Sequence, residues 1–588
     1  MKKIKIITSL ILLSLFVIQC KPEANAINFK KLTENYFDDK NALSPLDATV
    51  NGQNQYNDQL VFEMTDSYRK KQAEFFDNYE NELAKVDTQK LSAEEVNSFE
   101  IIKWEIAVGK EILKQPTNLM PLQQFWGTHL TMTQFASGSA AQPFKTEKDY
   151  TNFLKRMDLY AVWIDSAIVY MKKGIEKGMV LPKSLTVKVI PQFEEIITPK
   201  IEDNIFYSTL KTFPNNFTEA QKSHLTQEYT AAINNKLMPQ YQKMITFLKT
   251  EYLPASRNTS GIGSIPNGKE IYQAYVKQWT TTDKTPEEIH EIGLKEVARL
   301  NSEMEKVKEQ VGFKGTLKEF LNAVRNKKEL KPYTKPEEVL AHFQKIYATI
   351  KPNVDKLFSL QPKTKFEIRR TEAFREKTAS AEYIQGAVDG SRPGIFYVPI
   401  PNAKEYNVLE DEDLFLHEAI PGHHFQMSLQ QENTSLPDFR RYNWFGAYGE
   451  GWALYTESLG KELGLYNDPY QYLGMLNDEI HRAIRLVVDT GIHAKGWTRE
   501  QAIQYSLDNE AESEASITSE VERYMAIPGQ ALSYKIGQLK IIELRHKAEK
   551  ELGAKFDIKK FHAMVLESGV MPLALLEKKI DTWIKSSK

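Results

Sequence analysis

The sequence predicts a mainly α-helical protein, and three observations lead to that fold class. Capping boxes, in which a hydroxyl and a carboxylate or amide pair with the backbone N–H groups of a first helical turn, recur along the chain. They begin at Ser92, Thr285, Thr334 and Thr498. Strand-like alternation is rare, and no repeat of fixed period is apparent. The exception is a short region, residues 383–400, which predicts a small β-hairpin or sheet.

The first 19 residues predict an export signal. Three lysines precede an apolar stretch over residues 6–18, which is too short to span a bilayer but has the length of a signal peptide. Cys20, the only cysteine of the chain, follows almost at once. A cysteine in this place predicts cleavage and lipidation of Cys20. The alternative is an ordinary signal peptide with a chance cysteine, because Gln19 stands where a lipoprotein has a small residue.

The predicted anchor sets the expected location and the expected organisation. Residues 20–45 are expected to tether the protein to a membrane of the cell envelope, on the periplasmic or the surface face. A Gly/Ser/Asn-rich loop at residues 256–268 then indicates a boundary. We therefore expect an N-terminal helical region, residues 46–265, and a C-terminal helical region, residues 266–588.

The composition is that of a globular protein with a large core. Hydrophobic residues make up 41% and charged residues 26% of the chain, and the formal net charge is −2. Nucleic-acid binding is not expected, since it requires a concentrated basic surface. No disulfide is expected either, because the single cysteine is predicted to be lipidated.

The hairpin region lies just before a cluster of histidines. Its two extended segments flank a turn that contains Asp389 and Arg392, and the segment GIFYVPI carries Tyr397. The segment GIFYVPI predicts an edge strand, and an extended peptide can pair with an edge strand. Arg392 and Tyr397 are therefore predicted to contact a substrate; the alternative is a plain turn with a solvated arginine.

The histidine cluster, HEAIPGHH, is the strongest chemical pattern in the sequence. It holds His417, Glu418, His423 and His424. Two histidines and a neighbouring glutamate are typical of zinc hydrolases, in which the glutamate activates water. On a regular helix, position i+6 points about 120° away from His417 and position i+7 lies about 10.5 Å along the axis.

Pro421 and Gly422 offer a solution to this spacing. Proline interrupts a helix and glycine permits unusual backbone angles. A helix that bulges here would bring His423 into register with His417. His423 is therefore the first choice for the second ligand, and His424 is the alternative.

A third ligand is expected in the segment GEGWALYTE. Glu450 lies near the start of a predicted helix, from which a carboxylate could reach the metal. Glu457 is seven residues further on, so a straight helix cannot bring both to one ion. The alternative is that one or both are surface carboxylates.

These segments carry a resemblance to a known group of enzymes. HEAIPGHH with GEGWALYTE resembles the gluzincin metallopeptidases, in which two histidines and a glutamate from two helices bind zinc. The chain also resembles the DUF885 family of bacterial proteins, which is grouped with these peptidases. The matching segments are DGSRPGIFYV, HEAIPGHH, EGWALY, DTGIHAKGWT and ERYMAIPGQALSYKIG, over roughly residues 370–540. The resemblance implies a large multi-helix metallopeptidase-like fold and a Zn²⁺ cofactor.

Further residues could complete a peptidase site. His493 could stabilise an oxyanion, although a histidine at a helix end is more often a cap or a core residue. Tyr524 and Tyr534 could donate to the same oxyanion, and Arg523 could bind a substrate carboxylate. The alternative is that the tyrosines are packing residues and that Arg523 pairs internally with Glu520.

The sequence therefore predicts a zinc-dependent peptidase that acts on short peptides and uses Glu418 as the base. Two alternatives stay open: a surface lipoprotein that binds a metal or a ligand without turnover, and a metallohydrolase of a non-peptide amide or ester.

Overall fold

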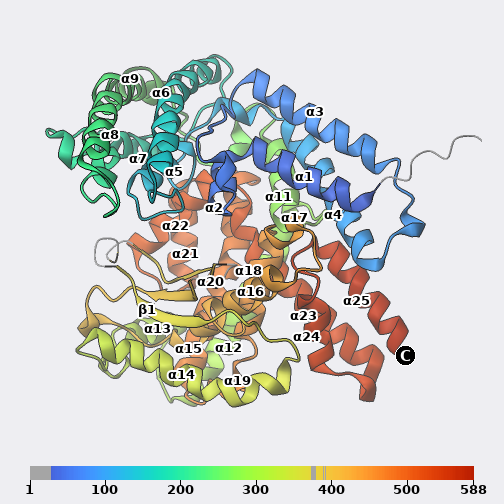
Figure 1. Cartoon of the computed structure of the whole chain (residues 1–588). Coiled ribbons are helices and arrows are strands. Elements are labelled where there is room, and N and C mark those ends of the chain that lie inside the picture. The colour runs from blue at the N-terminus through green and yellow to red at the C-terminus, as the bar shows by residue number, and fades with distance from the viewer. Residues whose placement is uncertain (1–27, 373–375, 377–378, 388–389, 391) are drawn as a thin grey trace, which may run out of the picture.

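The structure, a computed structural model, is mainly α-helical with one small sheet, as predicted (Figure 1). It describes residues 28–588 apart from 373–375, 377–378, 388–389 and 391. Within this part of the chain, no helix is both long enough and apolar enough to cross a bilayer.

The first part of the chain forms two groups of helices, with α5–α9 gathered at the upper left of Figure 1. The helices are α1 (Phe29–Leu43), α2 (Pro45–Val50), α3 (Asp66–Leu83), α4 (Ala93–Leu113), α5 (Thr128–Ala136), α6 (Glu147–Glu176), α7 (Lys183–Glu194), α8 (Glu219–Ala232), α9 (Met238–Phe247), α10 (Leu253–Ala255) and α11 (Gly268–Thr280). Helix α1 lies inside the segment predicted as a tether. Its residues Phe29, Leu32 and Tyr36 are buried in a hydrophobic core, so the folded chain begins at least 17 residues earlier than predicted (46 − 29 = 17).

The middle of the chain contains three helices and the sheet. These elements are α12 (Pro286–Gln310), α13 (Leu317–Arg325), α14 (Pro336–Leu357), β1 (Phe366–Arg370), β2 (Glu382–Ile384) and β3 (Gly394–Val398). The strand order is β1-β3-β2, with β1 parallel and β2 antiparallel to β3. The predicted hairpin is β2–β3. However, GIFYVPI supplies the central strand β3 and not an edge strand, because β1, which was not predicted, pairs with its other side.

The last part of the chain surrounds the predicted site. Its helices are α15 (Asp411–Glu418), α16 (His423–Glu432), α17 (Asp438–Arg441), α18 (Gly446–Glu457), α19 (Gly460–Leu463), α20 (Pro469–His493), α21 (Arg499–Asn509), α22 (Glu514–Ala526), α23 (Ser533–Leu552), α24 (Ile558–Leu566) and α25 (Leu573–Ser587). Capping boxes begin α4, α12 and α21 at the predicted Ser92, Thr285 and Thr498.

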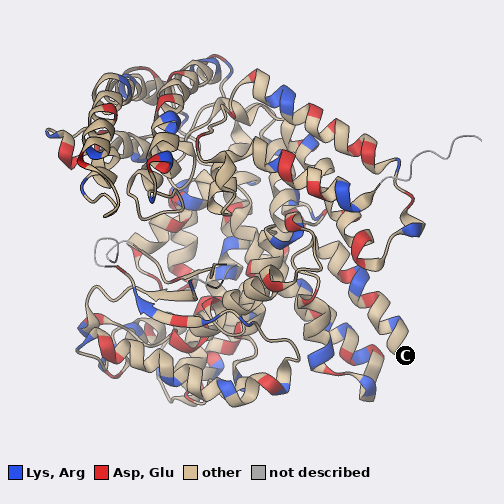
Figure 2. Ribbon diagram, in the orientation of Figure 1, with Lys and Arg blue, Asp and Glu red and all other residues tan. Residues whose placement is uncertain are grey.

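Two hydrophobic cores meet on several helices. One core joins α1, α3 and α4 to most elements after α11, and the other is built mainly from α5–α11. In the last part of the chain, helices α18, α20, α23 and α25 contribute buried side chains to both, for example Trp452 of α18 to the first and Ala447 of α18 to the second. The predicted boundary near residue 265 therefore does not separate two independent cores. Charges of both signs are interspersed along the helices in this view (Figure 2).

Candidate metal centre

The histidine cluster lies where one helix ends and the next begins. Helix α15 ends at Glu418, the Ile420–Pro421 peptide bond is cis, and α16 begins at His423. The break that Pro421 and Gly422 predicted is present, but it separates two helices and does not bulge a single one. A side chain at Gly422 would collide with the carbonyl oxygens of Leu416 and His417, so only glycine permits this close approach.

Helix α18 holds this loop in place. The indole N–H of Trp452 donates to the carbonyl oxygen of Pro421 at 2.9 Å, and the Thr456 hydroxyl donates to that of Leu416 at 2.9 Å. Both bonds satisfy carbonyl groups that the helix break leaves without a partner. The segment GEGWALYTE therefore fixes the backbone of the histidine cluster as well as contributing to it.

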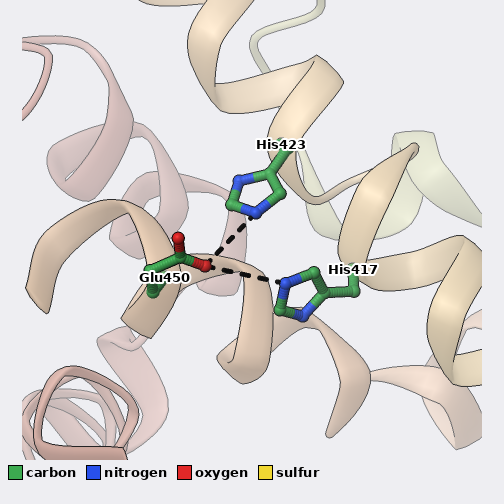
Figure 3. A group of neighbouring side chains, drawn as sticks. All are labelled: His417, His423 and Glu450. Carbon is green, nitrogen blue, oxygen red and sulfur yellow. Dashed lines mark ion pairs between the residues drawn. The ribbon is translucent and has the colours of Figure 1, made fainter. Parts of the chain in front are cut away.

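Three side chains from three helices converge on one point (Figure 3). Nε2 of His417 lies 3.8 Å and Nε2 of His423 lies 3.4 Å from the same oxygen of Glu450. The two imidazole rings are 4.9 Å apart and nearly perpendicular. Two imidazole nitrogens and one carboxylate oxygen are the protein ligands of a catalytic zinc site that leaves a fourth position open. The donor set and its convergence therefore fit zinc.

His417 is oriented by a residue that the sequence reasoning did not assign. Its Nδ1–H donates to Oε1 of Glu457 at 2.7 Å, and the Glu457 side chain is buried. This bond fixes the ring so that Nε2 is directed toward Glu450. Metal-binding histidines are commonly fixed in this way by a carboxylate. The spacing was the available signal, since Glu450 and Glu457 are two turns apart on one helix face.

The electrostatics of the cluster favour a cation. Burial alone would lower the pKa of His417, but the carboxylates of Glu450 and Glu457 raise it to about 10. Burial would raise the pKa of Glu450, but His417 and His423 hold it well below its usual range. Each group stabilises the charged form of the other, so the histidine protons balance the carboxylates, and a bound metal ion would replace those protons.

Glu418 lies beside the three converging side chains. Burial raises the pKa of its carboxyl group, and the nearby His423 and His417 partly oppose that shift. Its carboxylate accepts the backbone N–H of Tyr383 in β2. The hairpin is therefore attached next to this carboxylate, and β2 is an edge strand of the sheet.

His424 points away from the cluster. Its Nδ1 is 3.0 Å from the Tyr383 hydroxyl, and its ring packs 4.8 Å from that of Phe366. Burial lowers its pKa to about 4, so the ring is neutral at pH 7. The open choice between the two histidines is resolved by geometry: His423 joins His417 and Glu450, whereas His424 connects α16 to the hairpin.

A cavity of about 690 Å³ lies between α3, α4 and α11 and reaches the start of α18. Its aromatic lining includes Trp104, Trp279, Trp444 and Phe445. The ring of Trp444 is 5.9 Å from that of His423, and the Trp444 side chain is 40% exposed. An aromatic wall thus extends from the histidine cluster into the cavity.

His493 is not part of this cluster. Its Nδ1 accepts the backbone N–H of Ile262 at 2.9 Å, and its Nε2–H donates to the carbonyl oxygen of Tyr524 at 2.9 Å. Burial lowers its pKa to about 3. Both ring nitrogens are already paired within the fold, so this arrangement does not support the predicted role as oxyanion donor. His493 instead attaches the loop at residues 256–268 to the end of α20.

Arg523 and Tyr524 belong to an internal ion-pair network. Arg523 donates to both oxygens of Glu520, at 3.0 and 2.8 Å, and to Gln530 at 2.6 Å. The Tyr524 hydroxyl donates to Glu520 at 2.8 Å and accepts from Arg485 at 3.2 Å. The alternative noted from the sequence, an internal pair of Arg523 with Glu520, is therefore the observed arrangement. The predicted substrate and oxyanion roles of these two residues are not supported.

Tyr534 is placed differently. Among the residues that the structure describes, its hydroxyl has one hydrogen-bond neighbour, the amide N–H of Gln530 at 3.5 Å, and its ring packs 4.6 Å from the Arg485 guanidinium. The phenolic hydrogen is thus still available to an acceptor. One turn further along α23, Gly537 contacts Gly451, the neighbour of Glu450, so Tyr534 lies near the start of α18.

The remaining predicted residues lie on or outside the hairpin. Arg392 is exposed in the turn before β3, and Tyr397 is half-buried in β3, in register with Arg369. Neither joins the histidine cluster directly. Cys20 and Asp389 lie outside the described residues.

Comparison with known proteins gives a family and a fold. Residues 45–580 match a family described as "Bacterial protein of unknown function (DUF885)". No curated protein matches the chain. The chain is similar to a protein of known crystal structure from Colwellia psychrerythraea, provisionally described as a lipoprotein, with 28% identity, a TM-score of 0.86 and coverage of 95% of this chain and 99% of that one. A protein of unknown function from Shewanella oneidensis, also provisionally described as a lipoprotein, shares the fold at 19% identity, with a TM-score of 0.74 and coverage of 94% and 99%.

Proposed function

We propose that this chain, which belongs to the DUF885 family, is a zinc-dependent peptidase related to the gluzincins. One observation carries the proposal. Nε2 of His417, Nε2 of His423 and an oxygen of Glu450 face one point, and Glu418 stands beside it. The relationship to the gluzincins rests on HEAIPGHH and GEGWALYTE, which supply these four residues from three helices.

The roles of the residues follow from their chemistry. Zn²⁺ held by His417, His423 and Glu450 would supply a Lewis acid that acidifies water and polarises a carbonyl group. Glu418 would accept one proton from the attacking water and deliver it to the nitrogen of the leaving amine. The remaining hydroxyl group adds to the carbonyl carbon, so the products are a carboxylic acid and an amine.

Tyr534 is the best-placed donor for the oxyanion. Its phenolic hydrogen is available, whereas the hydroxyl hydrogen of Tyr524 and the Nε2–H of His493 are used inside the fold. A phenol that donates to the developing negative charge would stabilise the tetrahedral intermediate. This assignment keeps one of the three donors predicted from the sequence.

Two features support a peptide substrate. The edge strand β2 lies beside Glu418, and an extended peptide can add to such an edge through its backbone. The cavity next to Trp444 could accept a bulky apolar side chain. Arg392 and Tyr397 on the hairpin are the proposed contacts for the remainder of a short peptide.

The proposed location is the cell envelope. The predicted signal peptide and Cys20 indicate a lipid anchor, and the similar protein from Colwellia psychrerythraea is provisionally described as a lipoprotein. Since α1 begins at Phe29, a tether of fewer than ten residues would separate the lipidated cysteine from the fold (29 − 20 = 9). We therefore propose that the enzyme acts close to the membrane surface.

A peptide-library digest tests the proposal. The wild type should cleave peptides, and Glu418→Gln should lower the rate by about 10²–10⁴-fold while it retains zinc. Glu500→Gln, an exposed glutamate far along the chain, is the matched control and should behave as the wild type. If the wild type and Glu418→Gln give the same products at the same rate, Glu418 is not the base. If zinc is bound and no peptide is cleaved, the protein is not a peptidase. The two alternatives are then a hydrolase of non-peptide amides or esters and a metal-binding protein without turnover.

A further inference from the structure

A second group of acidic side chains lies behind His417. Asp413 on α15, Glu457 at the end of α18 and Asp478 on α20 each bring one carboxylate oxygen within 4.8 Å of the others. Asp413 is fully buried and Glu457 is 1% exposed. Glu457 connects this group to the histidine cluster, since its Oε1 accepts Nδ1–H of His417.

Two of these carboxylates have oxygens without a hydrogen-bond partner. Within the described part of the chain, both oxygens of Asp413 lack a hydrogen-bond partner, and so does Oε2 of Glu457. Asp478 pairs with Arg482 through one of its oxygens. A buried carboxylate without a partner is costly, and most buried charges are paired or bind a metal. Three unpaired oxygens that share one buried space therefore point to a missing positive charge.

The surroundings increase the negative charge. Glu410, which is half-buried, and Asp411, which is buried, precede Asp413 at the start of α15. They accept from Asn477 and from the Tyr406 hydroxyl, which are neutral donors. Arg482 is the arginine that faces the group, and His417 faces it with Nδ1–H.

We infer that Asp413, Glu457 and Asp478 form a second metal site, for an oxygen-preferring divalent cation such as Ca²⁺. Oxygens on opposite sides of a Ca²⁺ ion are up to about 5 Å apart, because each Ca–O distance is about 2.3–2.6 Å. The spacing of the three carboxylates agrees with that span. An all-carboxylate set selects calcium, magnesium or manganese over zinc, which favours nitrogen and sulfur ligands.

The second cation would act on the first site through Glu457. It neutralises Glu457 on the side away from His417 and fixes the carboxylate that orients the imidazole. Asp413, Glu457 and Asp478 are thus positioning residues and would not touch a substrate. The inference does not depend on the proposed peptidase activity, since it concerns a binding site with its own ligands.

Metal analysis of the full mature chain tests the inference. The protein is stripped with a chelator, reloaded with zinc and dialysed against Ca²⁺, and both metals are counted. The wild type should bind one calcium ion per chain in addition to zinc. Asp413→Asn should lose calcium and keep zinc, and His423→Ala should lose zinc and keep calcium. Glu522→Gln, a buried glutamate that pairs with Arg499 away from the group, should keep both.

A stability measurement covers the case in which Asp413→Asn fails to fold. Ca²⁺ should raise the melting temperature of the wild type and leave that of Asp478→Asn, at the partly exposed edge of the group, unchanged. A wild type that binds no calcium, magnesium or manganese at millimolar concentration and gains no stability from them overturns the site. That result would mean that the carboxylates share protons, and it would leave the zinc count untouched.

Discussion

Two buried polar clusters of the C-terminal half look alike in sequence but differ in structure. One contains His417, His423 and Glu450, and the other contains His493, Arg523 and Glu520. In the second, hydrogen bonds of 2.6–3.2 Å pair the ring nitrogens of His493 and the side chains around Glu520. In the first, two Nε2 atoms face a carboxylate oxygen at 3.4 and 3.8 Å, too far for strong hydrogen bonds.

The difference in hydrogen bonding indicates which cluster can bind a ligand and which one stabilises the fold. Donors and acceptors that are fully paired inside the protein stabilise the fold and have nothing left for a ligand. Ligand atoms that converge without pairing leave room for an ion. Residue type alone could not distinguish the two clusters, because each offers histidine and glutamate near a helix end.

The tyrosines give the largest expected contrast between the clusters. Tyr534→Phe removes the proposed oxyanion donor and should lower kcat by about 10²–10³-fold, with the zinc content unchanged. Tyr524→Phe removes a hydroxyl that is already bonded to Glu520, so it should cost about 0.5–1.5 kcal/mol of unfolding free energy and leave kcat near that of the wild type. Peptide cleavage kinetics and urea unfolding measure the two effects. Equal loss of kcat in both variants would contradict the assignment.

Glu457→Gln should have an intermediate effect on the first cluster. The amide can still accept from His417 but carries no charge, so zinc affinity should fall by about 10–100-fold. Competition with a chelating dye measures that affinity. Glu522→Gln, a buried glutamate that pairs with Arg499 away from the cluster, serves as the control and should bind zinc as the wild type does. Unchanged zinc affinity in Glu457→Gln would show that the carboxylate does not support His417.

His493→Gln should affect stability alone. The variant keeps a donor for the Tyr524 carbonyl but leaves the Ile262 N–H unpaired, at a cost of about 1–3 kcal/mol at pH 7.5. The pKa of His493 is about 3 in the folded chain and 6.5 when unperturbed. Below pH 6.5, His493 is therefore protonated in the unfolded chain but stays neutral in the folded chain. The free energy of unfolding of the wild type falls as the pH falls through this range.

Glutamine does not titrate in this range, so the variant has no such pH dependence. The difference in unfolding free energy between the wild type and His493→Gln should therefore shrink by about 1.4 kcal/mol from pH 7.5 to pH 5.5. Urea unfolding at the two pH values measures the gap. A variant that keeps its stability and loses zinc or peptide cleavage would instead return His493 to the active site.

Much of the fold was predictable because the relevant signals are local. Ser92, Thr285 and Thr498 cap helices through neighbours three residues away, and the hairpin follows from a turn between two extended segments. Strand β1 and helix α1 were missed because tertiary packing decides them. β1 pairs with a strand nearly thirty residues further on, and α1 is held by core contacts with distant helices.

The candidate site shows the same limit. The break at Pro421 and Gly422 could be inferred from two residues, but its shape depends on Trp452 and Thr456, which hold the carbonyl groups of Pro421 and Leu416. The choice between His423 and His424 also required the fold, since Tyr383 from the hairpin binds His424. Long-range contacts of this kind leave no pattern in a single sequence.

Zinc counting in two neighbouring variants tests the central claim most directly. His423→Ala removes a proposed ligand, and His424→Ala removes the adjacent histidine that the fold uses to attach the hairpin. We predict one zinc ion per chain in the wild type and in His424→Ala, and none in His423→Ala. Zinc retained by His423→Ala and lost from His424→Ala would contradict the account.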